Sequence, residues 1–429
     1  MVLKKFPSRV SCNKILVVNH VSTYNKGDEA IMKVLIRGLK RVAPQAELTV
    51  LSSSPSYDSA VLDVRTHGDI QHVNKRFPAL VYAFLIITWA LFRRYTSLNL
   101  DRIFSSEAQI VLNEYAESSI IVSRGGDFFN DTYGLKPLVS QCFVVFLAIL
   151  LGKRVMLCAH SFGPFRKTLF IKITGAILNK SSLITTRGKV SIAWLNQMKV
   201  NRPPIYQCAD LAFLLKPASN EKINQILTRE NIPIGEKPLV GLSVNKWLQY
   251  SIQKNRSTAE QRYQELISLM RHIVDYLTVN LGTFVVIVPH VFDFPFDDRD
   301  IARDIIKEVK MKSCVHLIEG EYSAEEIKGV ISNLDMFIGC RMHAVIASTS
   351  TFVPTIAISY MDKFRDIMGI LDQEQWVCDA SKINYTDIES KINEMWSNRA
   401  AVRNCLKQKT RVARRFAKRN FFLLKKIVD

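Results

Sequence analysis

Apolar runs long enough for buried strands alternate with amphipathic stretches along the chain. KILVVNH at 14–20 predicts a strand, and the DEAIMKVLIRGLKRV stretch that follows carries apolar residues at helical spacing. The alternation continues with the strand signals AELTVLSS, SIIVSRGG at 118–126, KRVMLCAHS and SLITTRG. It returns in the second half with LVGLSVN at 239–245, TFVVIVPH at 283–290, CVHLIEG, DMFIGC, TIAISY and QWVCDA. Because strands that alternate with helices build parallel sheets, we expect an α/β protein with two Rossmann-like, doubly wound domains.

The length of the chain indicates how many domains it forms. A chain of 429 residues is too long for one ordinary hydrophobic core, which favours two domains. The best boundary is the polar, proline-containing stretch near 216–237, since it separates the two series of strands. We therefore predict an N-terminal Rossmann-like domain at 1–222, a C-terminal Rossmann-like domain at 223–385, and a basic helical tail at 386–429.

The net charge and the cysteines indicate which class of partner the protein binds and which cellular compartment it occupies. The net charge of +19 indicates an anionic partner, which could be nucleic acid, an acidic membrane face or a phosphorylated substrate. The eight cysteines are scattered and form no CxxC pair, which favours free thiols in a reducing compartment. The first 20 residues lack an apolar run long enough for a signal peptide. These features predict a cytoplasmic protein.

Two apolar runs and the tail raise the question of membrane contact. The runs at 79–92 and 142–151 are too short to span a bilayer. The first, which is flanked by two arginines, fits either a buried or docking helix or an interfacial membrane contact. Residues 403–429 carry ten Lys or Arg and one acid, with apolar residues interleaved. We read this tail as a basic amphipathic helix that docks on an anionic membrane surface, with packing against the first domain as the alternative. No recognition motif supports nucleic-acid binding.

Candidate chemistry is sought just after the strands, because ligands of doubly wound sheets bind beyond the carboxyl ends of their strands. This rule selects Asn19, Gly27, Asp28, Glu29, Gly125, Gly126, Asp127, His160, Ser161, Gly163, Arg187, Asn245, His290, Arg341 and His343. Local structure explains several of them as well, since acids cap helices and Gly-Gly-Asp makes tight turns. No GxGxxG follows a strand and no Walker loop occurs, so we expect no nucleotide cofactor. The histidines show no HxH or HxxxH pairing, so we expect no metal site.

Arg341 and His343 stand out because they follow a predicted strand inside the apolar stretch GCRMHAVIASTSTFVPTIAIS. A buried arginine needs an anionic partner, and its rigid fork matches a carboxylate or a phosphate. Histidine titrates near neutral pH and suits proton transfer. The pair therefore predicts an anion clamp beside a general acid. The alternative is an internal Arg–Asp pair with a hydrogen-bonded core histidine.

A set of motifs, in order and spacing, resembles the polysaccharide pyruvyl transferase family from about residue 14 to 375. They are GDEAI, SRGGDFFND, HSFGPF, TTRGKVS, CADLAFLL, PHVFD and GCRMHAVIASTSTFVPTIAISYMDKFRDIMGIL. The resemblance implies a fold similar to that of B-type glycosyltransferases, with the active site in the cleft between the halves. It also implies transfer of a pyruvyl group from phosphoenolpyruvate to a sugar of a surface or exopolysaccharide precursor, which forms a cyclic ketal.

The resemblance further implies roles for the selected residues. His343 and Arg341 become the catalytic candidates. The donor-binding candidates, in the second domain apart from Arg187, are Arg187, Arg341, His290 and Asn245. The acceptor-binding candidates, assigned to the first domain, are Asp28, Glu29, Gly125, Gly126, Asp127, His160 and Ser161.

The partners follow from the same reading. Phosphoenolpyruvate is a co-substrate and no cofactor is expected; the acceptor is a lipid-linked or nucleotide-linked sugar. The tail would bring the enzyme to the inner face of the plasma membrane. Two alternatives stay open at this point: a nucleotide-sugar-dependent glycosyltransferase of the same fold, and a non-catalytic scaffold in polysaccharide assembly.

Overall fold

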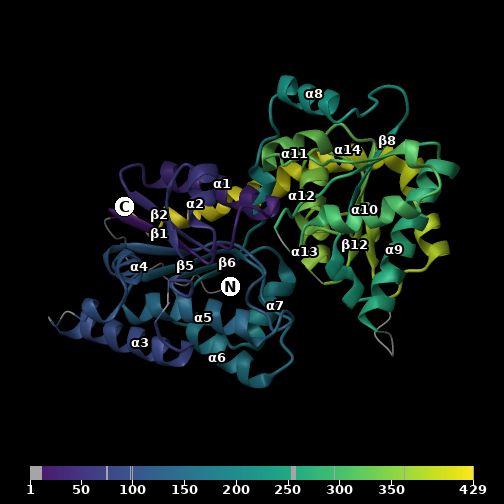
Figure 1. The fold of residues 1–429 in the computed structure, drawn as a ribbon. Helices are drawn as coiled ribbons and strands as arrows, with labels where there is room; N and C mark the ends of the chain where they lie inside the picture. Colours follow the sequence, from purple (N-terminus) through teal and green to yellow (C-terminus); the bar gives the residue numbers. More distant parts are fainter. Residues whose placement is uncertain are drawn as a thin grey trace. The chain divides into compact units, whose positions relative to one another are not determined.

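A computed structural model describes residues 12–73, 76–96, 98, 100–252, 258–293, 295–361 and 363–428 (Figure 1). The chain forms two compact units. Unit 1 contains residues 12–23, 31–211 and 416–428, and unit 2 contains residues 24–30 and 212–415. Residues 1–11, which belong to the segment searched for a signal peptide, lie outside the described residues.

Unit 1 is built on a seven-stranded parallel sheet with the order β3-β2-β1-β4-β5-β6-β7. Its strands are β1 (Lys14–Val18), β2 (Glu47–Ser52), β3 (Arg65–Gly68), β4 (Ile120–Ser123), β5 (Arg154–His160), β6 (Leu183–Thr186) and β7 (Ile205–Gln207). The central strands β1 and β4 are buried along almost their whole length, as expected for a sheet that is covered on both faces.

Helices cover both faces of this sheet. They are α1 (Lys26–Val42, whose first turn belongs to unit 2), α2 (Pro55–Leu62), α3 (Ala79–Tyr95), α4 (Ser106–Glu117), α5 (Leu135–Leu150), α6 (Thr168–Leu178) and α7 (Lys189–Gln197), with the 3-10 turn η1 (Asp101–Ile103). Helices α3 to α7 share one hydrophobic cluster with the sheet. Figure 1 shows α3, α5 and α6 beside one another on that face, with α1 and α2 on the other.

Unit 2 is built on a six-stranded parallel sheet with the order β10-β9-β8-β11-β12-β13. Its strands are β8 (Leu239–Ser243), β9 (Phe284–Ile287), β10 (Val315–Leu317), β11 (Met336–Gly339), β12 (Thr355–Ser359) and β13 (Val377–Asp379). Its helices are α8 (Asn220–Arg229), α9 (Ala259–Asp275), α10 (Asp298–Glu308), α11 (Ala324–Ile331), α12 (Met342–Ser350) and α13 (Lys363–Ile370). The short helical turns are η2 (Leu211–Leu214, at the border with unit 1), η3 (Lys246–Tyr250), η4 (Tyr276–Asn280), η5 (Lys312–Cys314) and η6 (Glu374–Trp376).

The predicted fold class is confirmed, because both sheets are parallel and doubly wound. The sequence pattern located all six strands of unit 2 but missed two strands of unit 1. These two, β3 and β7, are edge strands of four and three residues, and neither is fully buried. β3 (RTHG) contains no apolar residue, and β7 (IYQ) has only two apolar residues after a pair of prolines, so neither carries the apolar run that marked the other strands.

The units divide the chain differently from the predicted ranges. The stretch near 216–237 contains α8, whose Ile223, Ile226 and Leu227 are buried in the core of unit 2. Its polar appearance comes from the exposed face of this helix, so unit 2 begins earlier, at residue 212. Unit 2 also takes residues 24–30, the turn that opens α1.

The predicted tail is part of helix α14 (Tyr385–Leu424), which contributes to both units. Its end packs into unit 1, because Leu423 and Leu424 are buried and Asn420 is fully enclosed. A Cβ at Gly38 of α1 would lie 2.0 Å from the Phe421 ring, which shows how closely the two helices approach. The apolar residues at the end of the tail thus pack mainly in the interior of unit 1, which is the alternative that the sequence analysis left open.

Two further features concern membranes and thiols. Within the described part of the chain, no helix combines the length and the apolar character needed to cross a bilayer. All eight cysteines carry free thiols, and six of them are buried. Burial raises the pKa of Cys142 to about 11 and that of Cys340 to about 12, as is typical of structural rather than reactive thiols.

Candidate functional site

Each sheet has one point at which the strand order reverses, and polar residues follow the strands there. In unit 1 the order reverses between β1 and β4, and in unit 2 between β8 and β11. Asn19 and Arg124 follow the first pair of strands, while Asn245 and Arg341 follow the second. Such switch points are where ligands of doubly wound sheets bind, so each unit presents a candidate site.

Arg341 is held by a buried aspartate in unit 2. Its Nε donates to Oδ2 of Asp298 at 3.1 Å, and its Nη2 donates to Oδ1 of the same carboxylate. The backbone N–H groups of His290 and Val291 also donate to Oδ2 of Asp298, both at 3.1 Å. Burial raises the pKa of Asp298, although the charge of Arg341 opposes that rise. This pair therefore joins the end of β11 to the loop that carries His290.

His343 lies against the turn that opens α1. A Cβ at Gly27 would lie only 2.1 Å from Nδ1 of His343, so glycine is what lets the imidazole lie where it does. The backbone N–H of Lys26 donates to the carbonyl oxygen of His290 at 2.8 Å and fixes this turn beside the loop after β9. The GDEAI motif and the Arg-x-His motif, which are over 300 residues apart in sequence, thus meet within unit 2.

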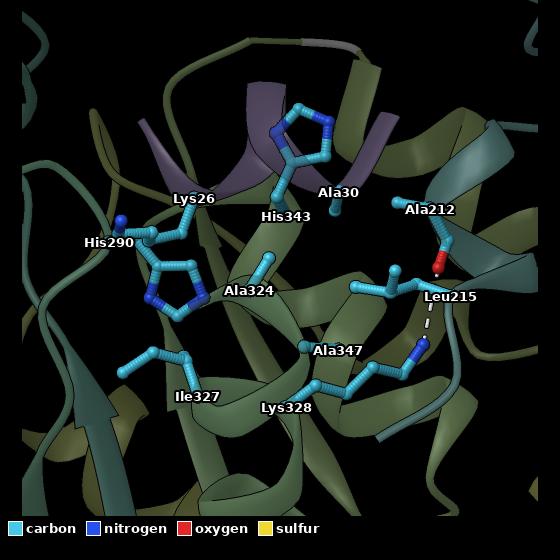
Figure 2. Close-up of a pocket in the computed structure, with 10 residues that line it drawn as sticks. All are labelled: Lys26, Ala30, Ala212, Leu215, His290, Ala324, Ile327, Lys328, His343 and Ala347. Carbon is cyan, nitrogen blue, oxygen red and sulfur yellow. Dashed lines mark hydrogen bonds between the residues drawn. The ribbon is translucent and has the colours of Figure 1, made fainter. Parts of the chain in front are cut away.

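A small cavity of about 20 Å³ lies at this meeting point (Figure 2). Lys26, His290, Lys328 and His343 supply its polar lining, and alanine, leucine and isoleucine side chains complete it. Figure 2 shows the His343 ring directed toward the first turn of α1 and the His290 ring beside Lys26. A space of this size suits a water molecule and is too small for phosphoenolpyruvate.

The two imidazoles differ in environment. His290 is 4% exposed, and burial lowers its pKa to about 3, with the charges of Arg341, His343 and Lys26 acting in the same direction. Its Nδ1 lies 3.3 Å from the carbonyl oxygen of Val288, which can only accept, so Nδ1 carries the proton and Nε2 the lone pair. His290 is therefore a neutral hydrogen-bond acceptor at its Nε2 atom. His343 is only half-buried.

Charged and amide groups surround these imidazoles. Nζ of Lys26 lies 3.1 Å from Glu29 and 3.6 Å from Glu321. Glu29 also accepts the backbone N–H of Ala324 at 3.0 Å, so it holds the start of α11 against the start of α1. Asn245 caps η3 through its Oδ1 and donates from Nδ2 to the Tyr360 hydroxyl at 3.3 Å. Its place at the switch point is fixed by these contacts.

Unit 1 holds a second buried polar group at the ends of β1, β4 and β5. Asn19, in the left-handed region at φ 63°, donates to the Ser123 hydroxyl at 2.9 Å. The same hydroxyl lies 2.9 Å from Nε2 of His160, whose ring packs edge-on against Phe129. Burial, and after it the charge of Arg187, lower the pKa of His160 to about 3.

The arginines of unit 1 are buried as well. Nη1 of Arg187 donates to Asp210 at 2.7 Å, and its Nε donates to the Ser161 hydroxyl at 3.1 Å. Arg124, which is wholly buried, donates to the carbonyl oxygens of Asn19 and Gly125, both at 3.0 Å. Arg187 therefore resembles Arg341 in having a buried aspartate as its partner.

Comparisons with known proteins agree with this arrangement of motifs. The family model described as polysaccharide pyruvyl transferase matches residues 25–362, which include the opening turn of α1 and the Arg-x-His motif. This chain belongs to the polysaccharide pyruvyl transferase family. The amylovoran biosynthesis protein AmsJ of Erwinia amylovora is 22% identical over 400 residues, which are 90% of this chain and 92% of AmsJ.

Solved structures confirm that this pyruvyl transferase family member has the predicted architecture. A glycosyltransferase from Rickettsia africae matches with a TM-score of 0.55 and 11% identity, over 96% of this chain and 99% of that one. HepE from Anabaena, solved in complex with UDP-glucose, matches with a TM-score of 0.54 and 10% identity, over 95% and 98% of the two chains. At these identities the likeness shows the fold alone, with two Rossmann-like domains similar to those of B-type glycosyltransferases.

The pyruvyl transferase motifs do not all lie where the sequence analysis placed them. Asp28 and Glu29 were assigned to the first domain, but the structure places them in unit 2 beside the Arg-x-His motif. They open α1, and sequence order alone cannot show that the first turn of a helix belongs to another unit. Arg341 has the internal aspartate partner that the sequence analysis gave as the alternative.

The remaining acceptor candidates lie in unit 1. A Cβ at Gly125 would lie 2.6 Å from the carbonyl oxygen of Ala159, so this glycine permits β4 and β5 to approach. A Cβ at Gly126 would meet the Phe128 ring. Asp127 accepts from the Tyr133 hydroxyl and from Asn130, so it organises its own loop. The structure therefore supplies a packing or turn reason for each.

Several residues of these pyruvyl transferase sites were missed by the sequence analysis. Asp298 and Asp210 are the partners of the two arginines, and Lys26 and Lys328 line the cavity. Asp298 stands in an acidic run at the start of α10, where acids ordinarily cap a helix, so nothing marks it out. Asp210 stands in the quoted motif CADLAFLL and could have been found there. In the part of the chain that the structure describes, no group of three or more His, Cys, Asp or Glu could hold a metal ion.

Proposed function

We propose that this protein transfers the pyruvyl group of phosphoenolpyruvate to two hydroxyls of a sugar and releases inorganic phosphate. A proton is added to the methylene carbon, which becomes the methyl group. The oxygen of one hydroxyl bonds to the adjacent carbon and gives up its proton. The second hydroxyl then displaces phosphate from the same carbon, and its proton leaves with the phosphate. The product is a cyclic ketal.

The observation that carries this proposal is the meeting of His343, His290 and Lys26 at the start of α1 and α12 in unit 2. Helix N-termini favour anions, and phosphoenolpyruvate carries both a phosphate and a carboxylate. Because the cavity itself has the size of a water molecule, the proposal depends on these side chains and not on its volume.

The two imidazoles take different roles in the proposal. His290 has its pKa lowered to about 3 by burial, so it is neutral and can only accept a hydrogen bond at Nε2. We propose that this Nε2 atom accepts a hydrogen bond from a sugar hydroxyl or from a protonated oxygen of phosphoenolpyruvate. This leaves His343, which is half-buried, to deliver the proton to the methylene carbon and to recover one from the first hydroxyl.

Arg341 is assigned to the donor through the resemblance, and its aspartate partner supports a precise orientation. Nε and Nη2 of Arg341 form a bidentate pair with Asp298, which holds the plane of the guanidinium in one orientation. The pair also fixes the backbone of His290, so Arg341 acts on the site as a positioning residue whatever its direct contact with the donor. The donor-binding role of Arg187 in unit 1 stays a prediction.

The acceptor class is inferred from the family and from the relative. The Erwinia amylovora protein is named for amylovoran biosynthesis, which supports a polysaccharide precursor as the acceptor here. We propose a lipid-linked or nucleotide-linked sugar in that role, within the biosynthesis of an exopolysaccharide.

The test measures donor binding and product formation separately. Binding of phosphoenolpyruvate to the full-length protein is measured by calorimetry, with UDP-glucose as the competing candidate. Product formation is followed by mass spectrometry of lipid-linked oligosaccharides after incubation with labelled phosphoenolpyruvate. We expect His343→Gln to keep donor binding but to lower kcat by about 10²–10⁴-fold, because the proton donor is removed. Arg341→Lys should weaken donor binding as well, because a point charge cannot replace the fork.

Matched controls come from the same unit. His272→Gln changes a histidine that pairs with Glu389 outside the cavity, and Arg299→Lys changes a neighbouring arginine that forms the same kind of bidentate pair with Asp297. Both should retain activity. Binding of UDP-glucose without binding of phosphoenolpyruvate would instead support the nucleotide-sugar glycosyltransferase. A fully active His343→Gln protein would remove this histidine from the reaction.

A further inference from the structure

One face of unit 1 exposes many large apolar side chains. It is formed by α3, α5 and α6, which contact one another in this order and lie side by side in Figure 1. We call it the α3–α6 face and define it by Leu80, Val81, Phe84, Leu91, Tyr95, Leu135, Val139, Leu169 and Ile173, each at least 36% exposed. Leu80 is 87% exposed and Phe84 67%. Such a concentration is unusual for a surface that meets only water.

The exposed residues follow the outer side of their helices. On α3, Leu80, Phe84, Leu91 and Tyr95 are spaced by four, seven and four residues, which places them on one side of the helix. The opposite side of α3 carries Ile86 and Trp89, which are buried in the core of unit 1. Helix α3 is therefore apolar on all sides. Packing within unit 1 accounts for its buried side but not for the apolar side chains on its exposed side.

The charges of this face have a single sign. No Asp or Glu occurs within α3, α5 or α6. Exposed basic residues lie within these helices or directly before α6; they are Arg93, Arg94, Lys136, Arg166, Lys167 and Lys172. Apolar side chains among cations, without acids, match the interface of a bilayer that contains anionic lipids.

We propose that the α3–α6 face docks unit 1 on an anionic lipid surface, with its helices lying in the interface. The length of α3, 17 residues with two arginines at its end, suits a helix in the interface and not one that spans. A second copy of the chain is a poorer occupant, because a two-fold contact would bring two identical sets of cations together. The proposal is independent of the donor and of the reaction.

This proposal takes up the interfacial membrane contact that the sequence analysis left open for the run at 79–92. It moves the lipid contact away from the C-terminal tail, which the sequence analysis favoured. Leu423 and Leu424 at the end of α14 are buried in unit 1 and are unavailable to lipid. Among the described residues of the tail, Val412 and Phe422 alone are large, apolar and exposed. The tail therefore provides the matched control for the test.

The experiment measures sedimentation of the full-length protein with vesicles of phosphatidylcholine and phosphatidylglycerol, and with phosphatidylcholine alone. We expect binding to the mixed vesicles, weakened by salt. The double variant Leu80→Glu/Phe84→Glu should bind at least about tenfold more weakly, because two carboxylates would have to enter the interface. Both positions are exposed, so the variant should melt at the wild-type temperature. The control Val412→Glu/Phe422→Glu should bind like the wild type.

A second variant keeps the test decisive if the first fails to fold. Arg166→Glu/Lys172→Glu leaves the apolar residues in place and should lose binding to the mixed vesicles. The proposal is overturned if the wild type does not bind the mixed vesicles, or if the folded variants of the α3–α6 face bind them as well as the wild type does. It is also overturned if the tail variant is the one that loses binding. Light scattering without lipid tests whether a second copy of the chain occupies this face instead. If the wild type is a dimer and the double variant is a monomer, the face is an interface between copies, and the lipid proposal is overturned.

Discussion

At the scale of single residues, both units bury charged and titratable groups that a folded chain ordinarily keeps in water. Arg341 pairs with Asp298 in unit 2, and Arg187 pairs with Asp210 in unit 1. Removing one member of such a pair leaves an uncompensated buried charge, which costs about 3–5 kcal/mol. The pairs therefore add little to the stability of the fold, but they hold the arginine side chains in fixed orientations. His160 is also buried, and none of its observed hydrogen bonds is to an acid. The effect of this burial on its pKa can be tested through the pH dependence of protein stability.

The pKa of His160 predicts acid sensitivity. Burial and the charge of Arg187 lower this pKa to about 3, whereas the unfolded chain has a value of about 6.5. Below pH 6.5 the unfolded state therefore binds a proton that the folded state refuses, so stability falls as the pH falls, by up to about 1.4 kcal/mol per pH unit. We expect His160→Gln to lose less stability than the wild type between pH 7 and pH 5, measured as the shift in urea midpoint.

The same measurement between pH 8 and pH 7 serves as the control. An ordinary histidine hardly titrates there, so the two proteins should respond equally. If His160→Gln and the wild type also shift in parallel between pH 7 and pH 5, His160 takes up its proton in the folded state and the assigned cause of its pKa is wrong.

The sequence predicted much of the candidate site at this scale, and it offered an Arg–Asp pair for Arg341 as an alternative, but it did not identify the partner residues. His290, Arg341 and His343 were selected because they follow strands, and the structure brings them together. Asp298 was missed because an acid at the start of a helix already has an ordinary explanation. A pattern along the chain shows which residues reach the edge of a sheet, but partners come from other loops and only the fold brings them near.

At the scale of elements, α1 shows how one helix can serve two purposes. Its first turn belongs to unit 2 and supports His343, while its later turns pack in unit 1. Gly27 and Gly38 mark these two roles, because each allows a ring to approach the helix. The sequence identified α1 from its periodicity, yet periodicity gives the side that is buried and not what buries it. The edge strands β3 and β7 were missed for another reason, since their residues, RTHG and IYQ, form no apolar run.

The two glycines predict different losses. In Gly27→Ala the new methyl group would lie 2.1 Å from Nδ1 of His343, so the imidazole must move, and we expect kcat/KM to fall by about 10²-fold. In Gly38→Ala the methyl group would lie 2.0 Å from Cε1 of Phe421, so packing within unit 1 suffers while the specific activity of folded protein stays. Steady-state kinetics and thermal unfolding of both variants separate these effects.

Each variant controls for the other, because both place alanine in the same helix and gain its higher helix propensity. Equal losses of activity in the two variants would show that α1 responds as a single body. The assignment of Gly27 to the support of His343 would then fail.

At the scale of the whole molecule, each unit is assembled from segments that are distant in sequence. Unit 1 takes the end of α14, and unit 2 takes the turn that opens α1. The sequence predicted two doubly wound domains correctly because alternation of strands and helices is a local signal. It could not predict these exchanged segments, because they look like ordinary helix ends wherever they pack.

Asn420 tests the contribution of the chain's end. Its Oδ1 accepts from the Thr185 hydroxyl at 2.6 Å, and its Nδ2 donates to the carbonyl oxygen of Ala209 at 3.2 Å. We expect Asn420→Ala to destabilise unit 1 by about 2–3 kcal/mol, because buried partners lose their hydrogen bonds. Hydrogen exchange of the amides of β5 and β6 measures this loss.

Asn398→Ala is the matched control on the same helix, since this asparagine is exposed and bonds only to the carbonyl oxygen of Glu394 among the contacts observed. Its effect should stay within about 0.5 kcal/mol. Should Asn420→Ala be equally mild, the end of α14 would be a cover on unit 1 and not part of its core.

The place of residues 416–428 in unit 1 has a consequence for biosynthesis. A ribosome makes the strands of the first sheet before it makes residues 416–428, which belong to the same unit. Nearly all of unit 2 is made between these two parts of unit 1. The nascent first sheet must therefore wait, with part of its apolar surface uncovered, until this late segment has left the ribosome.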